Sequence, residues 1–248
     1  MGKSLHATWL GRVDYVDGWR TQEAVATRVR DGGAERLLLL EHDPVYTIGR
    51  RGTTDHLLVG PDVLRAAGVS VYRVDRGGDI TYHGPGQLVG YPITAFAEGA
   101  DLVAYVRAIE EALRDALGSY GVASRTEPGK TGVWVDLPDG RPAKIAAIGV
   151  RVSRGVTTHG FALNVSTDLA AFERMLPCGF QHEVASLERL GVTAGVSEVG
   201  KRCARALAAR LGRDLVVGTS VEAPRDAEIP TDAPVRAALN LLAEPLPA

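Results

Sequence analysis

The apolar residues of this 248-residue chain alternate between helix-like and strand-like patterns, and this alternation most constrains its fold. Residues 15–30 predict a helix that ends at two glycines, and residues 36–41 form a short apolar run typical of a strand buried on both faces. Residues 69–74 alternate with period 2, as a strand does. Helices interleaved with strands indicate a single α/β or α+β domain.

The second half of the chain continues the pattern. Asp101 can cap a helix over residues 101–120, whose apolar stripe begins at Leu102. A short turn at Arg154 and Gly155 joins two predicted strands, which favours a mixed central sheet flanked by helices over an all-parallel one. We expect about seven strands, with a catalytic domain over residues 1–220 and a Pro/Ala-rich tail over 221–248. The remaining predicted helices are 61–67, 168–175 and 197–211, and the remaining strands are 132–135, 144–153, 157–165 and 214–217.

Charge and cysteine content exclude several classes of protein. The net charge of −2 argues against a strongly basic nucleic-acid binder. No apolar run approaches about 18 residues, so no membrane span is expected. Two cysteines are too few for a disulfide framework, and no two histidines stand at metal-ligand spacing on one element. We therefore expect a cytoplasmic protein without a metal site or cofactor.

The two cysteines have different surroundings. Cys203 lies in an apolar stripe of the last predicted helix, which indicates a packing role. Cys178 lies between Pro177 and Gly179, a turn that can present a side chain to a cleft. The local sequence leaves two interpretations of Cys178 open, a nucleophile and an incidental turn cysteine.

Lys144 is one of only four lysines among 28 basic residues, and it begins a strand whose face is otherwise apolar. Burial lowers the pKa of a lysine, which then exchanges protons near neutral pH as an arginine does not. A thiolate needs such a partner to act as a nucleophile. The alternative is a strand-end lysine whose ammonium group reaches solvent.

Two further segments are candidates for the walls of a binding cleft. Residues 76–88 hold four glycines, which let the backbone approach a ligand closely, and His83 stands within them. The alternative is a β-hairpin with glycine turns. Residues 158–164 form the second candidate wall, in which His159 either meets a ligand or is a satisfied edge histidine. His42 ends a predicted strand and is a candidate to support a site residue.

Together these segments resemble the lipoyl(octanoyl) transferases. The resemblance rests on RGGDITYHGPGQL (76–88), KIAAIGVR (144–151), HGFALNV (159–165) and PCG (177–179), with EHDPVYTIGR (41–50) in support. It implies the α/β fold of the biotin and lipoate ligase catalytic domain. It also implies transfer of an octanoyl group from acyl carrier protein to a lysine of lipoyl domains, the first step of endogenous protein lipoylation, without a cofactor. The implied acceptors are lipoyl domains of 2-oxoacid dehydrogenases and the glycine cleavage H protein.

The resemblance also implies roles for individual residues. Cys178 matches the cysteine that carries the acyl thioester, and Lys144 the lysine that lowers the pKa of that thiol. Because both protein partners are usually acidic in this family, Arg50, Arg51, Arg151 and Arg154 are expected to form a docking face. The implied substrate-binding residues are Arg76, Gly77, Gly78, Asp79, Ile80, Thr81, Tyr82, His83, Ala147, Ile148, Gly149, Gly160, Phe161 and Ala162.

Three other functions stay open at this point. An ATP-dependent lipoate or biotin ligase needs no cysteine nucleophile, and the pairing of Cys178 with Lys144 argues against it. A non-catalytic acyl- or peptide-binding module predicts no covalent species. A thioesterase predicts release of free octanoate.

Overall fold

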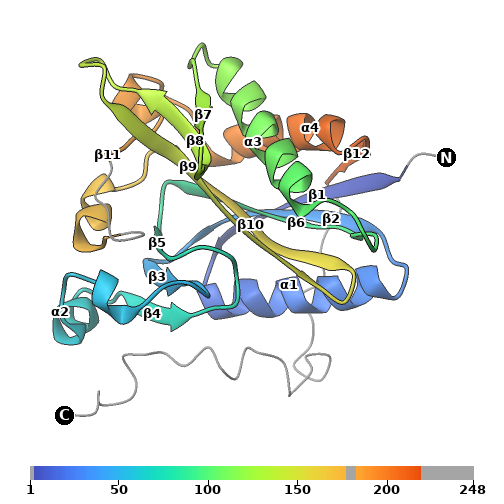
Figure 1. The fold of residues 1–248 in the computed structure, drawn as a ribbon, viewed down its shortest axis with the longest axis horizontal. Helices are drawn as coiled ribbons and strands as arrows, with labels where there is room; N and C mark the ends of the chain where they lie inside the picture. The colour runs from blue at the N-terminus through green and yellow to red at the C-terminus, as the bar shows by residue number, and fades with distance from the viewer. Residues whose placement is uncertain (1–2, 177–182, 219–248) are drawn as a thin grey trace.

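A nine-stranded mixed sheet forms the centre of the molecule (Figure 1). The computed structural model describes residues 3–176 and 183–218. The strand order is β12-β1-β2-β6-β10-β9-β8-β7, and β11 pairs with β9. Strands β12, β1 and β2 run parallel, whereas each pair from β2 to β7 is antiparallel, so the predicted mixed sheet is confirmed. The strands are β1 (Ser4–Val13), β2 (Glu35–His42), β6 (Gln87–Ile93), β7 (Arg125–Glu127), β8 (Lys130–Asp136), β9 (Pro142–Ser153), β10 (Val156–Asn164), β11 (Glu183–Val184) and β12 (Asp214–Val217).

Strand β2 explains why helices cover both faces of this sheet. Leu38 and Leu40 belong to the apolar cluster that contains residues of α1 (Tyr15–Arg30). Leu37 and Leu39 belong to the cluster formed with α3 (Leu102–Gly118) and α4 (Val196–Arg210). Successive side chains of a strand point to opposite faces, so a continuous apolar run must be buried on both. Figure 1 shows α1 below the sheet and α3 and α4 above it.

Aspartate side chains cap the starts of α1 and α3, and the predicted cap Asp101 is confirmed. Asp14 accepts a hydrogen bond from the backbone N–H of Val16 (2.8 Å) at the start of α1, and Asp101 accepts one from Val103 (2.7 Å) at the start of α3. Leu102, however, is 41% exposed, which corrects its predicted place in the buried stripe. It occupies the first helical position, one turn before the buried stripe begins at Tyr105.

A second sheet of three strands, in the order β4-β3-β5, lies beside α1 on the same side of the large sheet (Figure 1). Its core is apolar, and a smaller cluster joins it to Tyr15 and Trp19 of α1. Three short helices cover it, α2 and two 3-10 helices. The elements are β3 (Val45–Ile48), β4 (Ser70–Arg73), β5 (Ile80–His83), α2 (Pro61–Ala66), η1 (Thr54–His56) and η2 (Leu169–Arg174); a further 3-10 helix, η4, spans Glu188–Leu190.

The glycine-rich segment 76–88 forms neither a simple loop nor a hairpin. Its middle is β5 of the small sheet, and its end begins β6 of the large sheet. The chain crosses between the sheets at residues 84–86, where Gly86 has a φ of +80° and a Cβ would lie 2.5 Å from the Ser166 carbonyl oxygen. This crossing brings the two sheets together around one site.

The structure contains twelve strands among the described residues, more than the predicted seven or so. The sequence pattern missed β1, β3, β5, β7 and β11. Four of these are only two to four residues long, too short to show a period, and pairing with other strands stabilises them. Within the described ranges, no helix combines the length and the apolar character needed to cross a membrane.

Candidate functional site

Two adjoining cavities lie where the small sheet meets β9 and β10. The first is called the histidine pocket here, and the second the lysine pocket. Thr81, Ala147 and Ala162 line both cavities, so the two share a wall. The histidine pocket is further lined by Tyr15, Arg76, His83, Val89, Tyr91, Ile148, Gly149, His159, Gly160 and Phe161. The lysine pocket is further lined by Ile80, Gln87, Lys144, Ile145, Ala146, Asn164, Phe172, Met175 and Val184.

Two glycines on β9 and β10 let neighbouring backbone pack closely in the wall of the histidine pocket. Gly149 and Gly160 are register partners on these two strands. A Cβ at Gly160 would lie 2.1 Å from the Gly90 carbonyl oxygen, and one at Gly149 would lie 2.7 Å from the Gly77 carbonyl oxygen. Both contacts are with backbone atoms, which cannot move aside as the end of a flexible side chain can. Glycine is therefore required by close packing at these two positions.

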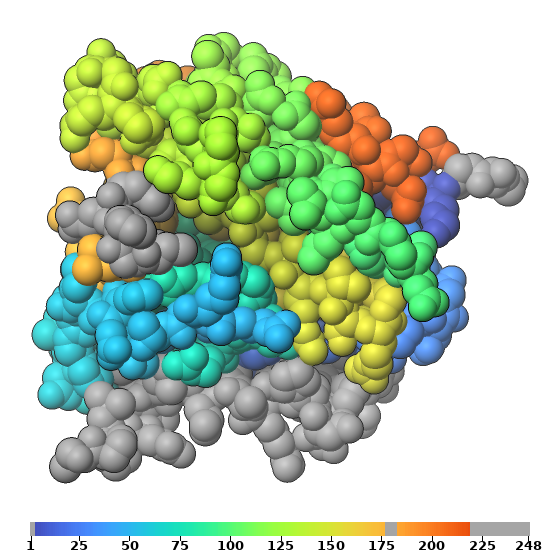
Figure 2. Space-filling model, in the orientation of Figure 1, coloured from blue at the N-terminus to red at the C-terminus, as the bar shows by residue number. Residues whose placement is uncertain are grey.

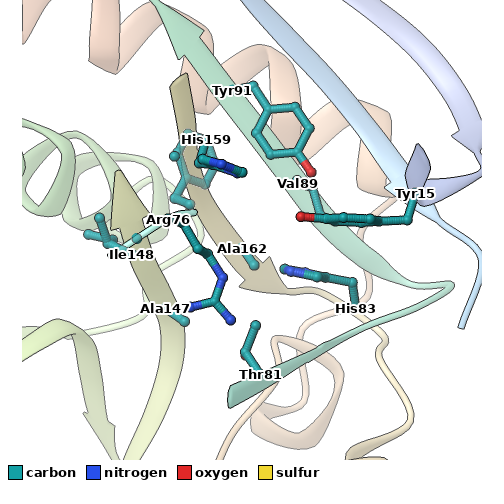
Figure 3. Close-up of a pocket in the computed structure, with 13 residues that line it drawn as sticks. Tyr15, Arg76, Thr81, His83, Val89, Tyr91, Ala147, Ile148, His159 and Ala162 are labelled. Carbon is teal, nitrogen blue, oxygen red and sulfur yellow. The ribbon is translucent and has the colours of Figure 1, made fainter. Parts of the chain in front are cut away.

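Arg76 brings a buried positive charge to the histidine pocket (Figure 3). Its Nη2 donates to the carbonyl oxygen and the hydroxyl of Thr47, at 2.7 and 2.8 Å, and its Nη1 donates to the Gly77 carbonyl oxygen at 3.1 Å. Burial lowers the pKa of Arg76 because the charged form loses hydration. The guanidinium is thus held in place by neutral oxygens.

Two of the three buried histidines in this region, His42 and His83, are neutral. Burial lowers the pKa of His42 to about 4 and that of His83 well below its usual value. His42 Nδ1 donates to the Val13 carbonyl oxygen at 2.8 Å, so its Nε2 accepts from the Tyr91 hydroxyl at 2.6 Å. Burial also raises the pKa of Tyr91. His42 therefore supports a pocket residue, as the sequence suggested. Figure 3 shows Tyr15, Tyr91, Arg76 and His83 converging on the cavity.

His159 lies in the same pocket in a strained backbone conformation. Its φ is +57°, a region that residues other than glycine rarely occupy. Its backbone N–H donates to Gln22 Oε1 at 2.7 Å, and its Nε2 lies 2.7 Å from Asp75 Oδ1. Burial works against ionisation of Asp75, but its bonds with His159 and Arg151 outweigh it and lower the pKa of that carboxyl. The structure thus brings His159 into the pocket beside His83.

Lys144 lines the second cavity and is the half-buried third residue of β9. Its ammonium nitrogen lies 4.8 Å from the ring centroid of Trp134, at a distance that gives a cation–π attraction. The register of β9 against β8 shifts here, because Lys144 pairs with Trp134 whereas Ala146 pairs with Val133. Neighbouring residues of β8 point to opposite faces, so Lys144 does not share the face of Ala146, which packs in the main core. The predicted apolar face around Lys144 is therefore wrong.

Four of the remaining predicted residues line neither pocket. Asp79 is buried, with its Oδ2 2.7 Å from His56 Nδ1, and the Tyr82 ring packs 5.3 Å from the Tyr46 ring. Neither they nor Gly77 and Gly78 line the two pockets, although the Gly77 N–H donates to the Val150 carbonyl oxygen. Cys178 lies outside the described residues. The sequence analysis did not identify Tyr15, Val89 and Tyr91, which come from segments without a motif.

Cys203 is fully buried in α4, and burial raises the pKa of its thiol to about 12, which confirms the packing role.

Of the four arginines expected in a docking face, Arg50, Arg51 and Arg154 are exposed, whereas Arg151 is half-buried and paired with Asp75. Figure 2 shows the blue-to-cyan segment that follows β3 beside the yellow β9–β10 hairpin.

Known proteins are similar to this chain in both sequence and fold. The model of the lipoyl protein ligase A/B catalytic domain matches residues 14–208. An octanoyltransferase of Solibacter usitatus (strain Ellin6076) is 49% identical over 216 residues, which are 86% of this chain and 96% of that protein. An octanoyltransferase of Mycobacterium ulcerans (strain Agy99) is 51% identical over 196 residues, 77% of this chain and 81% of that protein.

Among solved structures, a bipartite lipoate protein ligase from Thermoplasma acidophilum, studied with its E2 lipoyl domain, has a TM-score of 0.70. It is 20% identical, and the match covers 90% of this chain and 89% of that one. At this identity the likeness concerns the fold, and it confirms the predicted ligase-like architecture. From the matched catalytic domain and the relatives at about half identity, the chain belongs to the lipoyl(octanoyl) transferases and is an acyltransferase.

Proposed function

We propose that this acyltransferase moves an octanoyl group from octanoyl-acyl carrier protein to a lysine of lipoyl domains, through a thioester on Cys178. The acceptors are lipoyl domains of 2-oxoacid dehydrogenases and the glycine cleavage H protein, and the reaction takes place in the cytoplasm. Octanoyl transfer in lipoylation follows from the family. The observation that carries the proposed chemistry is a half-buried lysine in a cavity that adjoins a pocket walled by glycine and alanine.

Chain connectivity supports the pairing of Cys178 with Lys144. Cys178 follows Met175 by three positions and precedes Val184 by six, and both of these residues line the lysine pocket. Three extended residues span at most about 10 Å, so the chain cannot carry Cys178 far from this cavity. Val184 is also the register partner of Lys144.

In the first half-reaction, the Cys178 thiol gives its proton to Lys144, and the thiolate attacks the thioester carbonyl of the donor. A new thioester forms on Cys178, the bond to the carrier sulfur breaks, and the carrier thiolate takes the proton back from Lys144. In the second half-reaction, the amine of the acceptor lysine attacks the acyl-cysteine. An amide forms, and the proton from the amine returns to the Cys178 sulfur through Lys144. One thioester replaces another and the amide is more stable, so neither step needs ATP.

The histidine pocket suits the octanoyl chain. Its walls at Ala147, Gly149, Gly160 and Ala162 carry no side chain larger than a methyl group, and Val89, Ile148 and Phe161 add apolar surface. Among the lining groups that can form hydrogen bonds, Arg76, His83 and His159 bond to the protein itself, so an apolar ligand does not remove their partners.

Intact-mass measurement after mixing with octanoyl-acyl carrier protein tests this function. We expect one octanoyl increment on the wild-type protein and on Cys203→Ala, the matched control, and none on Cys178→Ala. Added lipoyl domain then takes up the increment on its lysine. Octanoylation without a covalent enzyme species, or an ATP-dependent reaction that survives in Cys178→Ser, overturns the proposal in favour of a ligase. Faster release of free octanoate than transfer overturns it in favour of a thioesterase.

A further inference from the structure

An unbroken line of buried hydrogen bonds joins the two pockets. From the histidine pocket, Arg76 donates to the Thr47 hydroxyl (2.8 Å), which lies 3.5 Å from His83 Nε2. His83 Nδ1 bonds to Gln87 Oε1 (2.8 Å), and Gln87 Nε2 donates to Asn164 Oδ1 (3.0 Å). In the lysine pocket, Asn164 Nδ2 then donates to the Ala185 carbonyl oxygen (3.0 Å). All five side chains in this line are buried.

Fixed partners determine the direction of every bond. Asn164 and Gln87 each donate to a backbone carbonyl, Gln87 to that of Tyr82 at 3.1 Å, so their amide oxygens accept. His83 therefore carries its proton on Nδ1. Its unprotonated Nε2 accepts from Thr47, whose oxygen already accepts from Arg76. Every donor thus points the same way, from the buried guanidinium to Ala185, and hydrogen bonds in such a chain reinforce one another.

The line ends at Ala185, and Ala185 in turn bonds to Lys144. The Ala185 N–H donates to the Lys144 carbonyl oxygen at 3.0 Å, and β11, immediately before Ala185, pairs in parallel with β9. Asn164 also accepts a bond from the Leu187 N–H at its own carbonyl (3.1 Å). The segment 185–187 is thereby attached to the end of β10 on one side and to Lys144 on the other. The Gln87 and Asn164 amides thus connect the segment that bonds to Lys144 with the histidine pocket.

We propose that Gln87 and Asn164 are positioning residues for acyl transfer, holding the Lys144 strand and β11 in register with the histidine pocket. Their effect on catalysis rests on the proposed function, since it acts through Lys144. Their effect on the geometry around Lys144 does not, and it is measurable on its own. Neither side chain needs to touch the reacting atoms.

Neutral replacements give the first test. Asn164→Leu and Gln87→Met keep much of the volume and break the line, so octanoylation of Cys178 should slow by about 100-fold, the cost of roughly 1 Å of misplacement. The KM for the donor should change less than about twofold. Tyr105→Phe is the matched control. It removes a buried hydroxyl that bonds to Pro92 and Thr157, on the same two strands but away from the pockets, and it should leave the rate within about twofold.

Asn164→Asp should make the rate of octanoylation depend on pH in a way that a loss of stability alone would not. Ionised, the new carboxylate faces the Ala185 carbonyl oxygen and repels it, whereas protonated it donates to that oxygen. The rate of Asn164→Asp relative to wild type, measured on protein shown to be folded, should therefore rise as pH falls, by about tenfold per pH unit above the new group's pKa. The Asn164→Leu ratio should stay flat. A flat ratio for both variants, or rates like that of wild type, overturns the proposal.

NMR of the four lysines, labelled with ¹³C at Cε, separates this proposal from the proposed function. The Lys144 signal should shift in Asn164→Leu and Gln87→Met and stay in place in Tyr105→Phe. An unchanged Lys144 signal in the first two variants overturns the positioning role, whether or not the enzyme transfers octanoate. A wild-type protein that fails to transfer overturns the proposed function, and the NMR result still decides the positioning.

Discussion

The histidine pocket and the lysine pocket share a wall but differ in how their ionisable groups are treated. In the first, burial holds His83 neutral and keeps the hydroxyls of Tyr15 and Tyr91 protonated, and the Arg76 guanidinium bonds to fixed oxygens. In the second, a half-buried lysine faces an aromatic ring and a cavity. The ionisable groups of the first pocket thus keep one protonation state. The proposed function requires the opposite of the second, an exchange of a proton at Lys144.

The largest expected effect tests the chemical side of this contrast. Lys144→Met removes the proton carrier, and Lys144→Arg keeps the charge but not the ability to release a proton. Both should slow octanoylation of Cys178 in a single-turnover mass assay by about 10²–10⁴-fold. Lys130→Met is the control, because the Lys130 ammonium lies over the same Trp134 ring, 5.5 Å from its centroid, outside both pockets. Full activity of Lys144→Arg would show that charge alone is needed.

The buried, neutral His42 beside the histidine pocket predicts that the stability of the protein depends on pH. His42 has a pKa of about 4 in the folded protein against 6.5 when unfolded, so the unfolded chain binds more protons between these values. The free energy of unfolding should fall as pH drops from 6.5 to 4, by about 3 kcal/mol from this residue. Urea titrations at several pH values measure this slope. His42→Gln cannot titrate and should flatten it; an equal slope in the variant would contradict a neutral His42.

The smallest of the three effects concerns the shape of the histidine pocket. Gly160→Ala forces a methyl group against the Gly90 carbonyl oxygen and Pro92, so the free energy of unfolding should fall by about 1–3 kcal/mol. Gly118→Ala, at the end of α3 with open space around it, should be neutral or slightly stabilising. Urea denaturation compares the two. Equal stability of the variants would mean that the wall between β10 and β6 is not close-packed.

Local signals identified most of the regular elements. The start of α3 follows from Asp101, and the end of α1 follows from the glycines after it. The strands β3 and β5 carry four residues each and depend on pairing with each other, which no local pattern displays. The stretch 76–83 illustrates the limit for the site. Its glycines predicted a ligand-facing loop, yet Arg76, Ile80, Thr81 and His83 reach the pockets, whereas Asp79 and Tyr82 serve the small sheet itself.

By itself the sequence determined the alternation of elements and the burial of Cys203, because each depends on a repeat within one helix or strand, whereas the bulge that separates Lys144 from the core face of β9 has no such signal. Tertiary structure alone decided which distant residues meet. His42 bonds to Tyr91 across 49 positions, and Gln87 to Asn164 across 77. Such pairs exist because the chain crosses from the small sheet into the large one at residues 84–86, which sets the register of both sheets around the two pockets.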